Sequence, residues 1–110
     1  MVYDTDLADR IRVCLESEDR LTEKAMFGGL AFLIDGNMAI AASGEGGVLV
    51  RADPKESDEL VRTTSATLAV MRGRPMAGWL RVAPEDLRSQ RELEQWVRLG
   101  AGYARSLPAK

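Results

Sequence analysis

Runs of apolar residues separated by glycine-rich turns are the clearest pattern in the chain. Two such runs, residues 30–34 and 37–42, flank Asp35-Gly36, a pair typical of the two-residue type I′ turn of a β-hairpin. Both faces of these two strands are apolar, which indicates a strand pair that is either covered on both sides or used in an interface. Alanines on one face leave room for a close neighbour. After a flexible turn, residues 48–51 return as a third strand.

Two further strands are predicted in the second half of the chain. Residues 67–71 and 78–82 have the composition of strands, and the segment Arg72-Gly73-Arg74-Pro75 between them is a turn. Residues 20–26 lead into the sheet with a weaker alternation, which is compatible with a short edge strand.

Three helices are expected around these strands. The first spans residues 5–18 with Thr5 as its N-cap, and its helical spacing places Cys14 on the buried face. The second starts at Asp53, an N-cap followed by proline. The third follows Ser89, which forms a capping box with the glutamate three positions later.

The order helix, three strands, helix, two strands, helix is typical of an α+β domain. We therefore predict one domain over residues 1–110, with an antiparallel sheet of about five strands (a three-stranded meander plus a hairpin) and flanking helices. No apolar run approaches the roughly 20 residues of a membrane helix. The acidic N-terminus has no signal-peptide pattern, so we expect a cytoplasmic protein without membrane contact.

The residue types in the chain exclude several kinds of chemistry. It has no histidine and one cysteine, Cys14, which excludes a zinc site, a Cys-His nucleophile pair and an intramolecular disulfide. The paired carboxylates at Asp58-Glu59 and Glu85-Asp86 lie at expected helix starts, where acidic side chains stabilise the helix dipole. We find no catalytic constellation and expect neither enzymatic activity nor a cofactor or metal.

The net charge of −2 is unevenly distributed. Residues 1–61 carry 6 Lys/Arg and 13 Asp/Glu, whereas residues 62–110 carry 9 Lys/Arg and 4 Asp/Glu. A basic second half is compatible with a nucleic acid or an acidic partner, and equally with an arginine-rich solvated surface. The candidates for contact with an anion, a nucleic acid or a protein partner are Arg72, Arg74, Arg81, Arg88 and Arg91.

Trp79 is a second candidate for nucleic-acid contact. It shares one side of a predicted strand with Arg81, and this pair could stack a base. The alternative is that Trp79 belongs to the core or to an interface.

The paired glycines Gly28-Gly29 raise the question of a phosphate-binding loop. Such loops open a helix, whereas here a strand follows. A bend or bulge that admits a close neighbour is therefore the better interpretation.

Three segments of the chain resemble the N-terminal domain of the TfoX/Sxy family of competence regulators. The first, KAMFGGLAFLIDGNMAIAASGEGGVLVRADP, contains a Met-Phe-Gly-Gly start, a hairpin with glycine at its tip and a third strand that ends in a basic residue. The hallmark positions are Met26, Phe27, Gly28, Gly29, Asp35, Gly36, Leu49 and Arg51. GWLRVAPEDL and WVRLGAGYARSLP resemble a later strand with its following helix start and the closing helix.

The resemblance implies a small cytoplasmic bacterial α+β domain without known enzymatic activity. The best-known members of the family promote expression of DNA-uptake genes together with a cyclic-AMP receptor protein, and those members carry a second, C-terminal domain. The sequence ends at Lys110 without a counterpart of that domain, so we expect a stand-alone module. Its expected partner is a transcription regulator or a second copy in a homodimer. Weak nucleic-acid binding is the other alternative.

Overall fold

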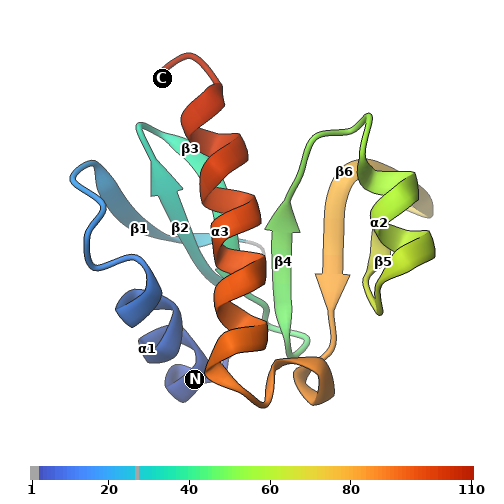
Figure 1. Cartoon of the computed structure of the whole chain (residues 1–110), viewed down its shortest axis with the longest axis horizontal. Helices are drawn as coiled ribbons and strands as arrows, with labels where there is room; N and C mark the ends of the chain where they lie inside the picture. The colour runs from blue at the N-terminus through green and yellow to red at the C-terminus, as the bar shows by residue number, and fades with distance from the viewer. Residues whose placement is uncertain (1–2, 27) are drawn as a thin grey trace.

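The computed structural model describes residues 3–26 and 28–110, and within them one antiparallel sheet carries helices over one of its faces (Figure 1). In chain order the elements are α1 (Thr5–Cys14), β1 (Leu21–Met26), β2 (Gly29–Ile34), β3 (Asn37–Ala42), β4 (Val48–Arg51), α2 (Ser57–Thr63), β5 (Thr67–Met71), β6 (Arg74–Val82), the 3₁₀ helix η1 (Pro84–Leu87) and α3 (Gln90–Ser106). The strands described lie in the order β1-β2-β3-β4-β6-β5. The predicted α+β class is confirmed, and β1 is the strand beyond the five expected.

The hairpin of β2 and β3 has the turn that its sequence predicts. Asp35 and Gly36 both have positive φ, 52° and 82°, and Ile34 pairs with Asn37 across the turn. This is the backbone that a type I′ turn requires. In β2 the two faces alternate, because Phe32 and Ile34 are buried beneath the helices whereas Ala31 belongs to a cluster on the opposite face. In β3 the expected alternation of Met38 and Ile40 on one face is wrong, because a register shift leaves Ala39 as an extra residue and places Met38 on the face opposite Ile40.

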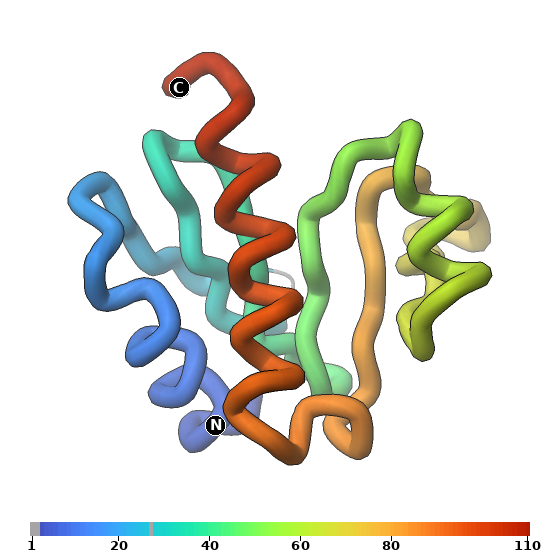
Figure 2. Tube along the Cα trace, in the orientation of Figure 1, coloured from blue at the N-terminus to red at the C-terminus, as the bar shows by residue number. Residues whose placement is uncertain are grey.

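The helix layer lies across one face of the sheet, with α3 over its middle, α1 on one side and α2 on the other (Figures 1 and 2). The core between the layers includes Ile11 of α1, Phe32 of β2 and Leu93 of α3, all fully buried. α3 begins at the predicted capping box: the Ser89 hydroxyl accepts from the backbone N–H of Glu92, and the Glu92 carboxylate accepts from that of Ser89.

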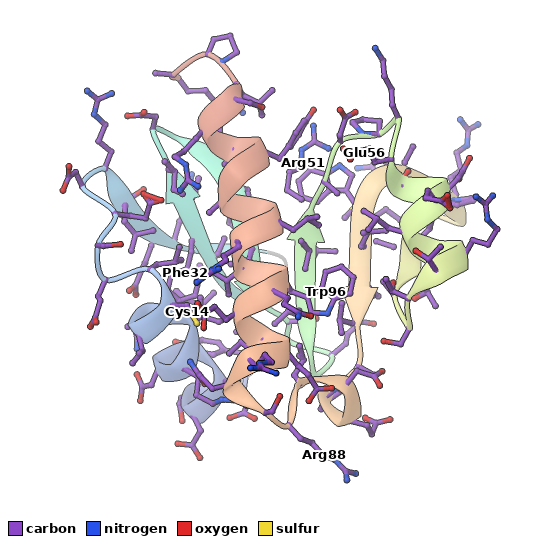
Figure 3. All side chains as sticks on the ribbon, viewed as in Figure 1. Cys14, Phe32, Arg51, Glu56, Arg88 and Trp96 are labelled. Carbon is purple, nitrogen blue, oxygen red and sulfur yellow. The ribbon has the colours of Figure 1, made fainter. Side chains whose placement is uncertain are left out.

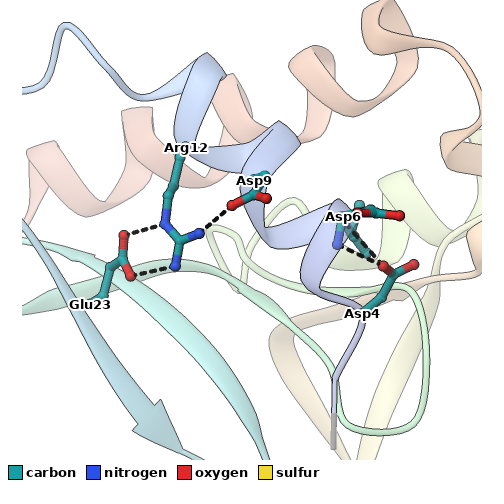
Figure 4. Close-up of polar contacts among 6 residues, drawn as sticks. Asp4, Asp6, Asp9, Arg12 and Glu23 are labelled. Carbon is teal, nitrogen blue, oxygen red and sulfur yellow. Dashed lines mark hydrogen bonds and ion pairs between the residues drawn. The ribbon is translucent and has the colours of Figure 1, made fainter. Parts of the chain in front are cut away.

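The carboxylate of Asp4 caps the N-terminus of α1, and that of Glu23 on β1 forms an ion pair with the same helix (Figure 4). The Asp4 carboxylate accepts the backbone N–H groups of Asp6 and Leu7 at 3.0 and 3.2 Å, so Asp4 and not the predicted Thr5 is the N-cap. Two turns later, the Arg12 guanidinium donates to both carboxylate oxygens of Glu23 on β1, at 2.7 and 2.8 Å. This hydrogen bonding holds the pKa of Glu23 below its ordinary value.

Three other predicted boundaries are wrong. The Asp53 carboxylate accepts the backbone N–H of Lys55 at 2.9 Å and closes a turn, so α2 begins only at Ser57. β6 begins at Arg74, earlier than expected, because its first residues pair with β5 before the strand bends. α1 ends at Cys14, before the predicted residue 18.

Candidate functional site

The face of the sheet opposite the helices is also apolar. We call it the concave face and define it by the buried residues Ala31, Met38, Ala41, Leu49 and Ala69, with Met26, Leu33, Met71 and Trp79 half-buried around them. These side chains come from every strand of the sheet described above. The sequence left open whether the second apolar face is covered or used in an interface. The helices pack on the other face, and this one borders two hollows.

The sheet curls around the concave face. A hollow of about 190 Å³ is lined by Met26 of β1 and Met71 of β5, so the two edge strands approach each other across it. Register shifts between β2 and β3 and between β5 and β6 add the local bend that this curl needs. A second, open hollow of about 750 Å³ runs from Met26 past Trp79 to residues 107–110.

The floor of the concave face is made of small side chains. Ala31, Ala41 and Ala69 are at most 4% exposed, and each presents only a methyl group. These small side chains leave the sheet backbone accessible to a close neighbour on this face. The half-buried methionines at the margin have three rotatable bonds each, so they adapt to the shape of an apolar occupant.

The charges around the larger hollow have one sign. Lys24 and Arg51 line it, and among the described residues no Asp or Glu side chain does. Beside the smaller hollow the charges are balanced, because Arg81 forms an ion pair with Glu45 and also contacts the Ser43 hydroxyl at 3.3 Å.

Arg51 has the most unusual surroundings of these cations (Figure 3). Its guanidinium carbon lies 4.6 Å from the ring centroid of Trp79 and 5.3 Å from that of Tyr103. Trp79 is its cross-strand partner on β6, and Tyr103 comes from α3. Both distances are within the range of a cation–π interaction. The two rings hold the guanidinium at the edge of the larger hollow.

The structure distributes the five predicted contact arginines over three places. Arg72 and Arg74 are exposed at the β5–β6 hairpin tip, and Arg88 and Arg91 are exposed beyond the other end of β6, around the start of α3. Arg81 alone lies on the concave face, and it is paired with Glu45.

The contact between Trp79 and Arg51 was not predicted from the sequence. Trp79 lies on the same side of β6 as Arg81, as expected, but its ring stacks on Arg51. In the sequence, Arg51 is marked only as a hallmark position of the family resemblance. The aromatic neighbours of Arg51 come from a paired strand and from a helix that is distant in sequence, so no spacing pattern in the sequence predicts them.

The Gly28-Gly29 pair shapes the sheet, as predicted. A Cβ on Gly29 would lie 2.1 Å from the backbone oxygen of Ala42, so the neighbouring strand occupies the space of a side chain. Gly28 precedes β2 with φ of +76° and open space around it. Among the other hallmark positions, Met26 ends β1, Asp35 and Gly36 form the turn, and Phe27 lies outside the described residues.

Cys14 is packed between α1 and the start of α3. Burial raises the pKa of the Cys14 thiol, whose sulfur accepts a hydrogen bond from Gln90 at 3.3 Å, as befits a packed side chain. Within residues 3–26 and 28–110, no cluster of three or more Cys, Asp or Glu side chains is arranged to hold a metal ion. None of the helices described has the length and apolarity needed to cross a membrane.

The family model of the TfoX N-terminal domain matches residues 14–104. The chain belongs to this family. The match runs from the last residue of α1 almost to the end of α3 and so includes the whole sheet, Arg51, Trp79 and Tyr103. The resemblance that the sequence showed is thereby confirmed. Among curated proteins no match to the chain was found.

Proposed function

We propose that this TfoX N-terminal domain is a non-enzymatic regulatory module that binds a partner protein on its concave face. The observation that carries the proposal is an apolar surface on the side of the sheet that the helices leave free. The outer face of an antiparallel sheet is usually polar where it meets water. An apolar face with hollows and half-buried methionines is instead typical of a binding surface.

The charges favour a partner over a second copy of the chain. A symmetric dimer through this face would pair two copies of a surface on which Lys24 and Arg51 are the charged side chains of the larger hollow. Like charges brought together in an interface oppose association, whereas an acidic partner complements them. A transcription regulator is the class of partner that the family resemblance suggests, and a homodimer is the alternative.

Nucleic-acid binding has weaker support. The exposed arginines lie at both ends of β6 and form no common surface with Arg81, which an ion pair neutralises. Phosphate backbones are bound by groups of cations that follow the strand, and their affinity falls as salt rises. If the protein causes no electrophoretic mobility shift of a nucleic acid at low salt, this alternative is excluded.

Matched substitutions test the concave face directly. Leu33→Glu places a charge at its half-buried margin, and Val13→Glu places the same charge on α1, where Val13 is 58% exposed. We expect wild type and Val13→Glu to capture the same proteins from nuclease-treated native cytosol, and Leu33→Glu to lose them. Retention of these proteins by a folded Leu33→Glu variant would contradict the proposal. Sedimentation of the wild type shows whether a dimer forms instead.

A further inference from the structure

Resting on the function proposed above, we propose that Arg51 is the anchor of the concave face and binds a carboxylate of an acidic peptide segment in the partner. The assignment starts from how the side chain is held. The rings of Trp79 and Tyr103 lie against the guanidinium, and a Cβ on Gly78 would come within 3.0 Å of its Nη1 atom. The arginine is therefore fixed before a ligand arrives, which lowers the entropy lost on binding.

The hydrogen-bonding groups of Arg51 set it apart from the other half-buried arginines. Among the described residues these are Arg10, Arg12 and Arg81, and each of them donates to a protein oxygen. Arg51 contacts aromatic rings and makes no hydrogen bond or ion pair with the described part of the chain. A guanidinium has five N–H donors in a planar fork that matches a carboxylate, and no side-chain nitrogen of the described residues is buried without a partner, so the donors of Arg51 face water and are open to a ligand. An anionic ligand would satisfy them.

The surroundings of Arg51 identify the ligand as acidic and partly apolar. Lys24 lines the same hollow, and together with Arg51 it gives the hollow a positive charge that attracts anions. The floor beside them contains Leu33, Met38 and Trp79, which offer apolar contact and few hydrogen-bonding groups. A nucleic-acid strand would leave its sugars and phosphates poorly matched on such a floor. A peptide with alternating acidic and apolar side chains matches both features.

The test uses a random peptide library selected against the whole wild-type chain. We expect the selected peptides to be enriched in Asp and Glu next to apolar residues. Their dissociation constants are then measured on Arg51→Met, on Arg51→Lys, which keeps the charge but loses the fork, and on Arg91→Met as the matched control at an exposed arginine of α3. Arg51→Met and Arg51→Lys should each weaken binding roughly tenfold or more, and Arg91→Met should leave it unchanged.

The outcomes separate this inference from the proposed function. If the selected peptides bind Leu33→Glu more weakly but bind Arg51→Met as tightly as wild type, the role of Arg51 is overturned. The concave face then remains the binding surface. Peptides that bind all folded variants equally, or a library that yields no binder, would contradict both. A library without acidic enrichment would overturn the acidic ligand. The acidic peptide ligand would also be overturned if a labelled single-stranded DNA bound the wild type more tightly than the peptides and did not bind Arg51→Met. Circular dichroism verifies that each variant is folded.

Discussion

Helix α3 touches the sheet most closely where it has no side chain. A Cβ on Gly100 would lie 2.2 Å from the backbone oxygen of Ala39 on β3 and 3.0 Å from its carbonyl carbon. Two residues further along the same helix, a Cβ on Gly102 would meet nothing within 4 Å. Replacing each glycine by alanine therefore adds the same methyl group to the same helix in two opposite environments.

The expected magnitudes have opposite signs. An ordinary carbon–oxygen contact is about 3.4 Å, so Gly100→Ala forces α3 and β3 roughly 1 Å apart in the middle of the core. Overpacking of this kind costs up to about 3 kcal/mol. Alanine recovers about 1 kcal/mol through its higher helix propensity, which leaves a net loss of about 2 kcal/mol. Gly102→Ala gains the higher helix propensity of alanine without any overpacking, so it should stabilise the fold by about 1 kcal/mol.

Equilibrium unfolding in urea measures both changes, because the free energy of unfolding extrapolates linearly to water. We expect the midpoint of Gly100→Ala to fall and that of Gly102→Ala to rise relative to wild type, with similar slopes. If Gly100→Ala proved as stable as Gly102→Ala, the close packing of α3 on β3 would be refuted.

Two further predictions concern contacts that tie segments together. Glu23→Gln removes the carboxylate that pairs with Arg12, and should lower stability by about 0.5–1 kcal/mol at about pH 7. The pKa of Glu23 is lowered in the fold, so its contribution is fully present above the ordinary value of 4.5 and is lost as pH falls from there through the folded pKa. Urea unfolding should therefore show a difference between variant and wild type that shrinks as the pH is lowered below 4.5. Asn37→Ala removes the hydrogen bond from the buried Asn37 amide to the Pro108 carbonyl at 2.9 Å, and should cost about 1 kcal/mol. It should also speed hydrogen exchange at the Lys110 amide, which donates to Asp35 at 2.8 Å; unchanged exchange there would contradict the anchoring of residues 107–110.

Local features of the fold could be predicted where the residues that determine them are adjacent in sequence. The turn at Asp35-Gly36 and the capping box at Ser89 depend on residues at most three positions apart. The start of α2 was misplaced, although its signal is also local, because Asp53 accepts a hydrogen bond in a turn as readily as at a helix N-terminus. The early start of β6 follows from pairing with β5.

The candidate site was harder to predict because its parts are distant in sequence. The apolar pattern of residues 30–42 did indicate a second apolar face with small side chains. The arginines that the charge distribution suggested lie in separate places in the fold. Arg51 instead contacts Trp79, because β4 pairs with β6, and Tyr103, because α3 lies over the sheet. These neighbours become visible only when the sheet order and the helix layer are known.

Methyl NMR is the most direct test of the claim that the concave face is the binding surface. Three of the five methionines, Met26, Met38 and Met71, belong to this face, so ¹³C-methyl labelling of methionine observes it selectively. Valine labelling adds Val13 on α1 as an internal control, since it is exposed on the helix side.

The titration adds the captured partner or a selected peptide to the labelled chain. We expect the signals of the three concave-face methionines to shift and saturate together while that of Val13 stays in place. Shifts at Val13 with unchanged signals for Met26, Met38 and Met71 would contradict the account.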